Sequence, residues 1–496
     1  MGHISGEERG QATLFPATPD EYINAENPVR FIDAFVASLK LSELGFVRAQ
    51  PAATGRPGYA PGDLLRLYLY GYLNRVRSSR RLELEAGRNL EVMWLLRRLK
   101  PDFKTIADFR ARNPQALTAA CKQFVALCRQ WDLFGGELVA VDGSKFRASN
   151  SRERIFTANQ LSKRLERIEQ KIREYLAELD ETDRREESAP ATARLSAQEL
   201  REKIAKLQQR QHRYQGLQEQ LAQQQTTQIA QTDPDARLMH QSQAQGGGSA
   251  VAYNVQSVVD AKHKLIVAHD VTTDSSDRQQ LARMATKAQQ ALGVAHLAVV
   301  ADQGYYDGDE VAACEEAGIA AYVSKPHTSK NLGRGLFSKE DFVYDSHGDR
   351  YRCPGEEWLS YRGTHTDAGR RVKYYFTAAC AGCKLRARCT AAKGPRRIKR
   401  LVKEEALERM AARVRAQPEK LAQRQAPVEH PFGTLKRAWN HAHFLLRTLP
   451  KVSAEFSLSV LAYNLRRVLS ILGPQPMIAA LAASTLPLAL AQNHAR

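Results

Sequence analysis

Two short apolar runs in the chain each end in an aspartate, with a glycine one or two residues later. Residues 137–143 read Glu-Leu-Val-Ala-Val-Asp-Gly, and residues 296–304 read His-Leu-Ala-Val-Val-Ala-Asp-Gln-Gly. A continuous apolar run of this length is typical of a buried β-strand. The pattern therefore predicts that Asp142 and Asp302 stand at the ends of two strands. Side by side, two carboxylates repel each other unless a hard cation such as Mg²⁺ neutralises them.

The segments around the second run predict the rest of an α/β fold. Residues 249–261 and 264–272 are rich in Val and Ile and are separated by a short turn, which is typical of a hairpin. Residues 276–292 and 308–317 have helical spacing, and a short strand is expected over 320–324. The predicted order of strands and helices gives a mixed sheet with helices. Asp277 precedes the first of these helices, so we expect it to cap that helix, although a place near the two acids is an alternative.

Helical patterns dominate the remaining segments. Residues 1–136 contain two runs with helical spacing and Pro at or near their starts, Pro28–Leu41 and Pro61–Asn74. Residues 151–232 carry apolar positions spaced alternately four and three apart, which predicts an antiparallel, coiled-coil-like hairpin inserted into the sheet domain. Residues 418–472 are predicted to be helical again, and Gly473 with Pro474 ends the last helix.

The charge of the chain points to a polyanionic partner. The formal net charge is +19, and residues 66–112 hold twelve Lys or Arg against five acids. This local excess favours a DNA-binding helical domain, and the candidate contacts are Arg75, Arg77, Arg80 and Arg81. The alternative is an ordinary solvated basic face. We expect neither a membrane span nor a signal peptide, hence a cytoplasmic, nucleoid-associated protein.

Four of the seven cysteines form a second chemical pattern. Cys380 and Cys383 have the short spacing with which two thiolates meet one ion, Cys389 follows closely, and Cys353 lies further upstream. In a reducing compartment these thiols have no use as disulfides, so structural Zn²⁺ is the preferred interpretation. Free thiols and an iron–sulfur cluster remain alternatives. Cys121, Cys128 and Cys314 lie in apolar helical patterns, as core residues do.

Three motifs in order resemble the acid motifs of bacterial insertion-sequence transposases of the DDE (Asp-Asp-Glu) class. They are Val-Asp142-Gly-Ser-Lys, Ala-Asp302-Gln-Gly-Tyr and Val-Glu429-His-Pro-Phe-Gly-Thr-Leu-Lys436. The resemblance covers most of residues 15–473 and implies a ribonuclease-H-like core. It implies that Asp142, Asp302 and Glu429 bind catalytic Mg²⁺ or Mn²⁺, and that the protein acts on double-stranded DNA as a homodimer or higher oligomer.

The third motif adds two side chains to the predicted site. Pro431 is tolerated in the first turn of a helix, so Glu429 is expected at or beside a helix start. Lys436 is two turns further on and on the same face, where its ammonium could bind a phosphate. The family often has an arginine four residues before the glutamate, where this chain has Gln425. Arg424, one place earlier, is then the candidate for that phosphate contact. Trp439 could stack on a base, but core packing is the preferred interpretation.

These patterns predict five parts of the chain. They are a helical DNA-binding domain over 1–136, a catalytic core over 137–150, 233–330 and 418–473, the helical hairpin over 151–232, the cysteine-containing insertion over 331–417, and a tail over 474–496. The predicted function is that of a DNA transposase, which binds terminal inverted repeats and cuts and joins DNA strands. The alternatives are a catalytically inactive repressor derived from a transposase, and a nuclease of the same fold.

Overall fold

The structure is a computed structural model of the chain. It describes residues 18–484 except 52, 53, 55, 56, 152, 153, 187–191, 224–226, 242–246, 327–330, 368 and 369. The last part of the predicted tail, residues 485–496, lies outside the described residues. No helix in the described ranges is long and apolar enough to cross a membrane.

A six-stranded mixed sheet forms the centre of the molecule. The strand order is β4-β5-β1-β7-β8, with β6 on the same side of β5 as β4. β1 runs antiparallel to β5 and parallel to β7, and β7 runs parallel to β8. The strands are β1 Leu138–Arg147, β4 Arg237–His240, β5 Ser249–Asp260, β6 Ile266–Thr272, β7 Leu297–Ala301 and β8 Ile319–Val323. The predicted mixed α/β fold is confirmed.

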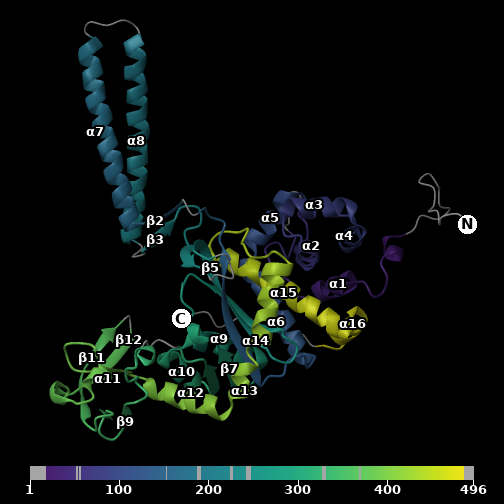
Figure 1. Ribbon diagram of the computed structural model, residues 1–496. Coiled ribbons are helices and arrows are strands. Elements are labelled where there is room, and N and C mark those ends of the chain that lie inside the picture. The colour runs from purple at the N-terminus through teal and green to yellow at the C-terminus, as the bar shows by residue number, and fades with distance from the viewer. Residues whose placement is uncertain are drawn as a thin grey trace, which may run out of the picture.

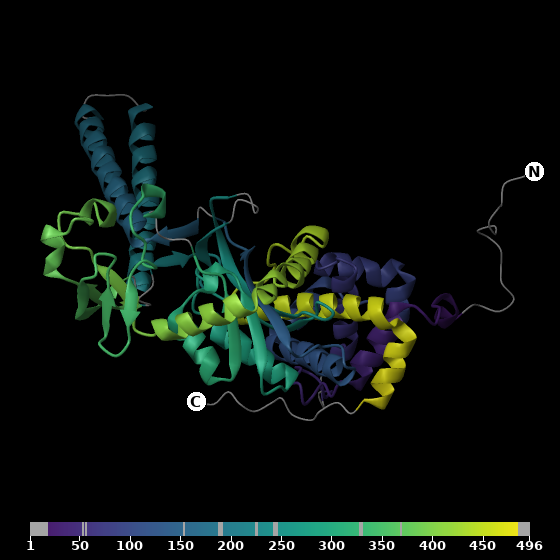
Figure 2. The same ribbon diagram turned by 60° about the horizontal axis from the view of Figure 1, so that its bottom comes forward.

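Helices from both ends of the chain pack together beside this sheet. The long helix α15 (Leu449–Leu472) contacts α6 (Pro114–Gln130), α2 (Pro61–Leu73) and β6, so the N-terminal helices and the sheet share one hydrophobic core. The first part of the predicted tail forms α16 (Pro474–Ala483), which packs on α1 (Pro28–Ser38). Figure 2 shows α16, in yellow, beside the purple N-terminal helices. The N-terminal helices thus obtain part of their core from the other end of the chain.

The helical hairpin projects away from the rest of the molecule (Figure 1). Its helices are α7 (Ala158–Glu186) and α8 (Thr192–Gln223), joined at the base by the two-stranded sheet β2 (Ile155–Thr157) and β3 (Gln228–Ala230). Leu161, Leu217 and Leu221 bury against Phe156 and Ile229 at this base. The apolar spacing in the sequence therefore corresponds to the contact between the two helices.

A second sheet, of five strands, is formed by the part of the chain that follows β8 and precedes the C-terminal helices. Its order is β13-β12-β11-β10-β9, all antiparallel, and it has a small core of its own. The strands are β9 Val343–Asp345, β10 Arg350–Arg352, β11 Trp358–Asp367, β12 Arg370–Phe376 and β13 Ile398–Leu401. After β13 the chain returns to the central sheet through α12 (Glu404–Ala416), which packs on α10 (Gly308–Glu316) and β8.

The remaining elements complete the chain. They are the helices α3 Ser79–Arg88, α4 Leu90–Leu95, α5 Phe103–Arg112, α9 Leu281–Leu292, α11 Arg386–Cys389, α13 Pro418–Ala422 and α14 Gln425–Phe432, the 3-10 helices η1 Pro19–Tyr22, η4 Gln303–Tyr305, η5 Leu332–Arg334 and η6 Ala378–Gly382, and the π-helix η7 Gly433–Ala438.

Candidate active site

Asp142 and Asp302 are carried by two neighbouring strands of the central sheet, β1 and β7. The parallel pairing of β1 with β7 sets Ala140 opposite Val300, and each aspartate stands two residues further along the chain, Asp142 within β1 and Asp302 directly after β7. Asp302 follows the end of β7, where its Oδ1 accepts a hydrogen bond from the Gly304 backbone N–H at 2.8 Å. Two neighbouring parallel strands therefore bring the two carboxylates to one place. The expectation that Asp142 stands at a strand end is wrong, because β1 continues past it to Arg147 in its pairing with β5.

The surroundings of Asp142 make its ionisation unfavourable. Burial, and next the nearby charge of Asp302, raise the pKa of Asp142 to about 7, while Arg424 opposes this shift. A carboxyl group that is buried beside another acid is relieved by a bound cation. Asp142 and Asp302 thus have the donor chemistry that a divalent cation requires.

This pKa shift predicts how the stability of the protein depends on pH. An unfolded Asp142 ionises near its ordinary value, so ionisation costs the folded state free energy as pH rises from about 4 to about 7. Above pH 7 and without divalent ions, we expect the free energy of unfolding of Asp142→Asn to exceed that of the wild type by up to about 4 kcal/mol, since one pKa unit is about 1.4 kcal/mol. The difference should shrink towards pH 4, and Mg²⁺ should narrow it at pH 8. Urea unfolding at both pH values checks this; a difference that is the same at pH 4 and pH 8 would contradict it.

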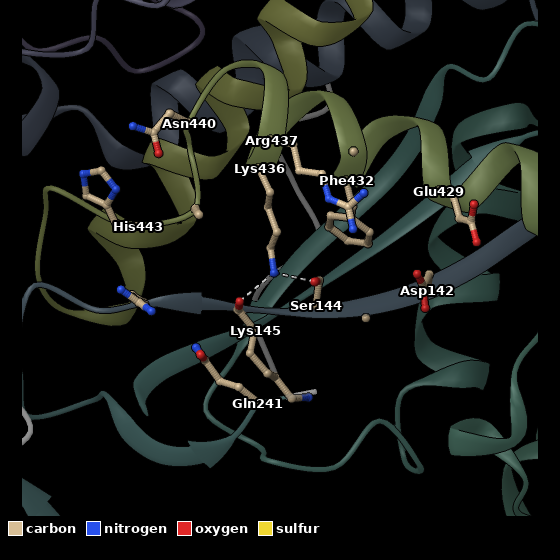
Figure 3. A pocket seen from close by; sticks show the side chains of 14 residues that line it. Asp142, Ser144, Lys145, Gln241, Glu429, Phe432, Lys436, Arg437, Asn440 and His443 are labelled. Atoms are coloured by element: carbon tan, nitrogen blue, oxygen red, sulfur yellow. Dashed lines mark hydrogen bonds between the residues drawn. The ribbon is translucent and has the colours of Figure 1, made fainter. Parts of the chain in front are cut away.

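Glu429 approaches the two aspartates from the C-terminal helices. It lies within α14, and Figure 3 shows it pointing across a groove towards Asp142 on β1. The expected position at a helix start is wrong, because Pro431 lies inside this helix. Proline cannot donate the helical hydrogen bond, and here the following turn widens into the π-helix η7. Glu429 is exposed to solvent.

Lys436 lies on η7 and faces the same groove. Its Nζ donates hydrogen bonds to Ser144 Oγ at 2.6 Å and to the Lys145 carbonyl at 2.7 Å, drawn as dashed lines in Figure 3. Burial lowers its pKa to about 8, and Asp142 opposes this shift. The predicted placement of Glu429 and Lys436 on one surface agrees with this geometry: both line the groove with Asp142.

Acidic and basic side chains line the groove together. Its volume is about 880 Å³, and beside the two acids, Asp142 and Glu429, its walls carry Lys436, Arg147, Arg437 and His443. In the described part of the chain, no group of three or more Asp, Glu, His or Cys side chains is placed so that it could hold a metal ion. Asp142 and Glu429 face each other across the open groove without forming such a group with Asp302.

The arginines predicted to bind DNA have different surroundings. Arg75, Arg80 and Arg81 are exposed near the end of α2 and on α3, and Arg424 lies close enough to Asp142 to lower its pKa. Arg77, in contrast, is buried, and it donates to the His443 carbonyl at 2.8 Å and to the Asn440 carbonyl at 3.2 Å. Its guanidinium is thus committed to the loop that borders the groove, and we leave it out of the proposed DNA-binding surface.

The sequence interpretation of Asp277 as a helix cap is wrong. The residue before α9 is Gln280, whose side chain makes no capping hydrogen bond, and the Ala282 N–H in the first turn donates to Glu310 of α10. Asp277 instead accepts hydrogen bonds from Asn254 and Gln256 on β5 and forms an ion pair with Lys145 on β1. The available signal was the alternation of Asn254 and Gln256 in a strand rich in apolar residues, since buried amides require polar partners. Trp439 is buried, in agreement with core packing.

The four cysteines of the second sheet line one small cavity. Cys353, Cys380, Cys383 and Cys389 all border a space of about 30 Å³. The cavity includes Gly355, where a Cβ would lie 3.5 Å from Cys383 Sγ and 3.6 Å from Cys353 Sγ. No metal-holding group is identified here within the described ranges. Cys121, Cys128 and Cys314 are buried, as expected of core residues.

Two protein-family models match the chain. Residues 17–112 match a Transposase domain (DUF772), and residues 352–469 match a Transposase DDE domain. Both matches are to transposase domains, and in this order they support a DDE transposase of the insertion-sequence type. The second match contains Glu429 and Lys436, whereas Asp142 and Asp302 lie outside both matched ranges.

Comparison with solved structures found a cryo-EM structure of the piggyBac transposase synaptic complex with hairpin DNA. The alignment covers 94% of this chain and 78% of that chain, with 8% identity and a TM-score of 0.32. A search of curated proteins found no match.

Proposed function

We propose that the groove between β1 and α14 is the site where this transposase cuts and joins DNA strands. The observation that carries the proposal is that Asp142, Glu429 and Lys436 line one groove (Figure 3), while the pairing of β1 with β7 sets Asp302 beside Asp142. The strand order, with a long antiparallel β5 between β6 and β1 and parallel β7 and β8 beyond, supports the ribonuclease-H-like core that the motifs imply.

Asp142 and Asp302 would hold Mg²⁺ or Mn²⁺, and Glu429 would complete the ligand set from across the groove. Two such ions, when bound, stabilise the charge on the attacking and leaving oxygens of an in-line displacement at phosphorus. The residues of the chain supply the rest of the chemistry. Lys436 donates from its ammonium to a phosphate oxygen, and its hydrogen bonds to Ser144 and Lys145 fix where that ammonium stands.

The basic residues around the groove would position the DNA backbone. Arg147 and Arg437 line the groove, and Arg75, Arg80 and Arg81 are exposed on the N-terminal helices. Such contacts neutralise phosphates and release counterions, so they supply affinity that decreases steeply with salt.

A cleavage assay tests this proposal. The substrate is duplex DNA that carries the sequences flanking the protein's own coding region, incubated with wild-type protein and Mg²⁺, Mn²⁺ or EDTA. We expect strand breaks at the element ends with Mg²⁺ or Mn²⁺ and none with EDTA. Specific binding without cleavage under any metal condition would favour the inactive repressor. Cleavage that never yields joined products would favour a nuclease.

We further propose that the four cysteines hold one structural Zn²⁺. Their convergence on one small cavity supports this, and four thiolates suit tetrahedral Zn²⁺. The small sheet has only a minor core of its own, so a metal would supply much of its stability. The role would be separate from the catalytic ions, because four thiolates leave no open coordination position.

Elemental analysis of purified protein should show about one zinc per chain, as a four-thiolate site requires. Cys383→Ser should lose that zinc and make residues 331–417 sensitive to protease. Cys314→Ser is the matched control, since Cys314 is buried away from the cavity on α10. Protein without zinc, whose four thiols all react freely in the native state, would exclude the site.

A further inference from the structure

A network of buried and partly buried polar side chains lies directly against the strand that carries Asp142. Asp277 Oδ1 accepts hydrogen bonds from Asn254 Nδ2 and Gln256 Nε2, each at 2.7 Å, and Lys145 Nζ lies 3.2 Å away. Asn254 and Gln256 are fully buried on β5, opposite Lys145 and Gly143 of β1. Three donors therefore hold one carboxylate oxygen in place beside the site.

Gly143 is the position that admits this carboxylate. A Cβ at residue 143 would lie 2.5 Å from Asp277 Oδ1 and 2.5 Å from Gln256 Nε2, closer than real Cβ contacts allow. A side chain at position 143 would therefore displace Asp277 and Gln256 from these contacts.

The same network reaches the turn that carries Asp302. Tyr305, three residues after Asp302, is buried and donates its hydroxyl hydrogen to Gln256 Oε1. Asp302 itself accepts from Gly304 in this turn. Gln256 therefore bridges the turn after β7 to Asp277, and Asp277 bridges in turn to Lys145 on β1. The chain of contacts connects β1, which carries Asp142, to the turn that carries Asp302.

We propose that Asp277 is a positioning residue that fixes Asp142 and Asp302 relative to each other for binding a divalent cation. The inference rests on the proposed function of these two acids. The negative charge of Asp277 is paired with the Lys145 ammonium, so the network adds rigidity at the site while leaving its net charge unchanged. Groups that orient metal ligands in this way commonly change metal affinity without contacting the ion.

Titration of the protein with Mn²⁺, with free Mn²⁺ followed by electron paramagnetic resonance, tests the proposal without relying on activity. Asp277→Ala should weaken Mn²⁺ binding by about tenfold or more, the effect usual for an orienting partner. Tyr305→Phe removes one hydroxyl and should weaken it by about fivefold. Asp274→Ala is the matched control, because Asp274 lies on the same loop but accepts from Thr272 and Gln280 outside the network.

Unchanged Mn²⁺ affinity in both Asp277→Ala and Tyr305→Phe would overturn the positioning role. Equal weakening by Asp274→Ala would also overturn it, since the effect would then belong to the loop as a whole. If the wild type binds Mn²⁺ and Asp277→Ala weakens binding, but no DNA is cut, the positioning role stands and the proposed function fails. If Asp142→Asn binds Mn²⁺ as tightly as the wild type does, both proposals fail.

Discussion

Asp142→Asn is expected to reduce DNA strand cleavage by about a thousandfold while leaving binding to the element ends largely intact, because the loss concerns charge stabilisation in the transition state. Asparagine keeps the shape of the side chain and removes the charge that a divalent cation requires. Affinity for DNA comes from Lys and Arg on phosphates, which this substitution does not touch. Asp302→Asn and Glu429→Gln should behave in the same way.

Cleavage rates and gel shifts, measured on the same DNA at the same salt concentration, check this expectation. Asp274→Asn serves as the control for removing an acid near the site, since its partners are Thr272 and Gln280. Wild-type cleavage by any of the three variants would remove that residue from the catalytic site. A parallel loss of binding and cleavage would instead indicate that the acid supports the fold.

Arg77→Ala is expected to destabilise the protein by about 3–5 kcal/mol, because it leaves a buried carboxylate without its ion pair. The partner is Glu455, which is 1% exposed and lies 3.5 Å from Arg77. Glu455 also accepts hydrogen bonds from the backbone N–H groups of Leu445 and Leu446. The pair thus connects the N-terminal helices to the loop that borders the groove.

Urea unfolding of Arg77→Ala and Arg80→Ala makes this prediction specific. Arg80 is exposed and lies over the Phe103 ring at 5.2 Å, so its removal should cost about 0.5–1 kcal/mol. Arg80→Ala should lower DNA affinity more than it lowers stability. If Arg77→Ala unfolds like the wild type but loses DNA binding, Arg77 is a DNA contact after all.

The positions of Asp142 and Asp302 could largely be predicted from the sequence, because buried strands appear in it as continuous apolar runs. The apolar runs before Asp142 and Asp302 exist because β1 and β7 are central strands covered on both faces. The hairpin helices are predictable for a similar reason, since their contact repeats at regular spacing. The mixed α/β fold follows from the order of these elements.

Side-chain partners far apart in the sequence are not predictable in this way. Nothing local distinguishes Arg77 from Arg80 and Arg81, and its burial depends on a loop more than 350 residues further on. Asp277 resembles a helix cap in sequence because it shortly precedes α9. Its actual partners lie on β5 and β1, and local sequence does not indicate them. The π-helix after Glu429 depends on how the chain accommodates Pro431, which residue spacing alone does not decide.

Anomalous X-ray scattering from Mn²⁺, in crystals of the protein bound to element-end DNA, tests the central claim most directly. We expect a Mn²⁺ peak coordinated by the carboxylates of Asp142 and Asp302, with Glu429 drawn to the same cluster and a DNA phosphate beside Lys436. The peak should disappear in Asp142→Asn. Mn²⁺ bound elsewhere while DNA is cut, or a phosphate placed away from the β1 edge, would contradict the assignment of this groove as the active site.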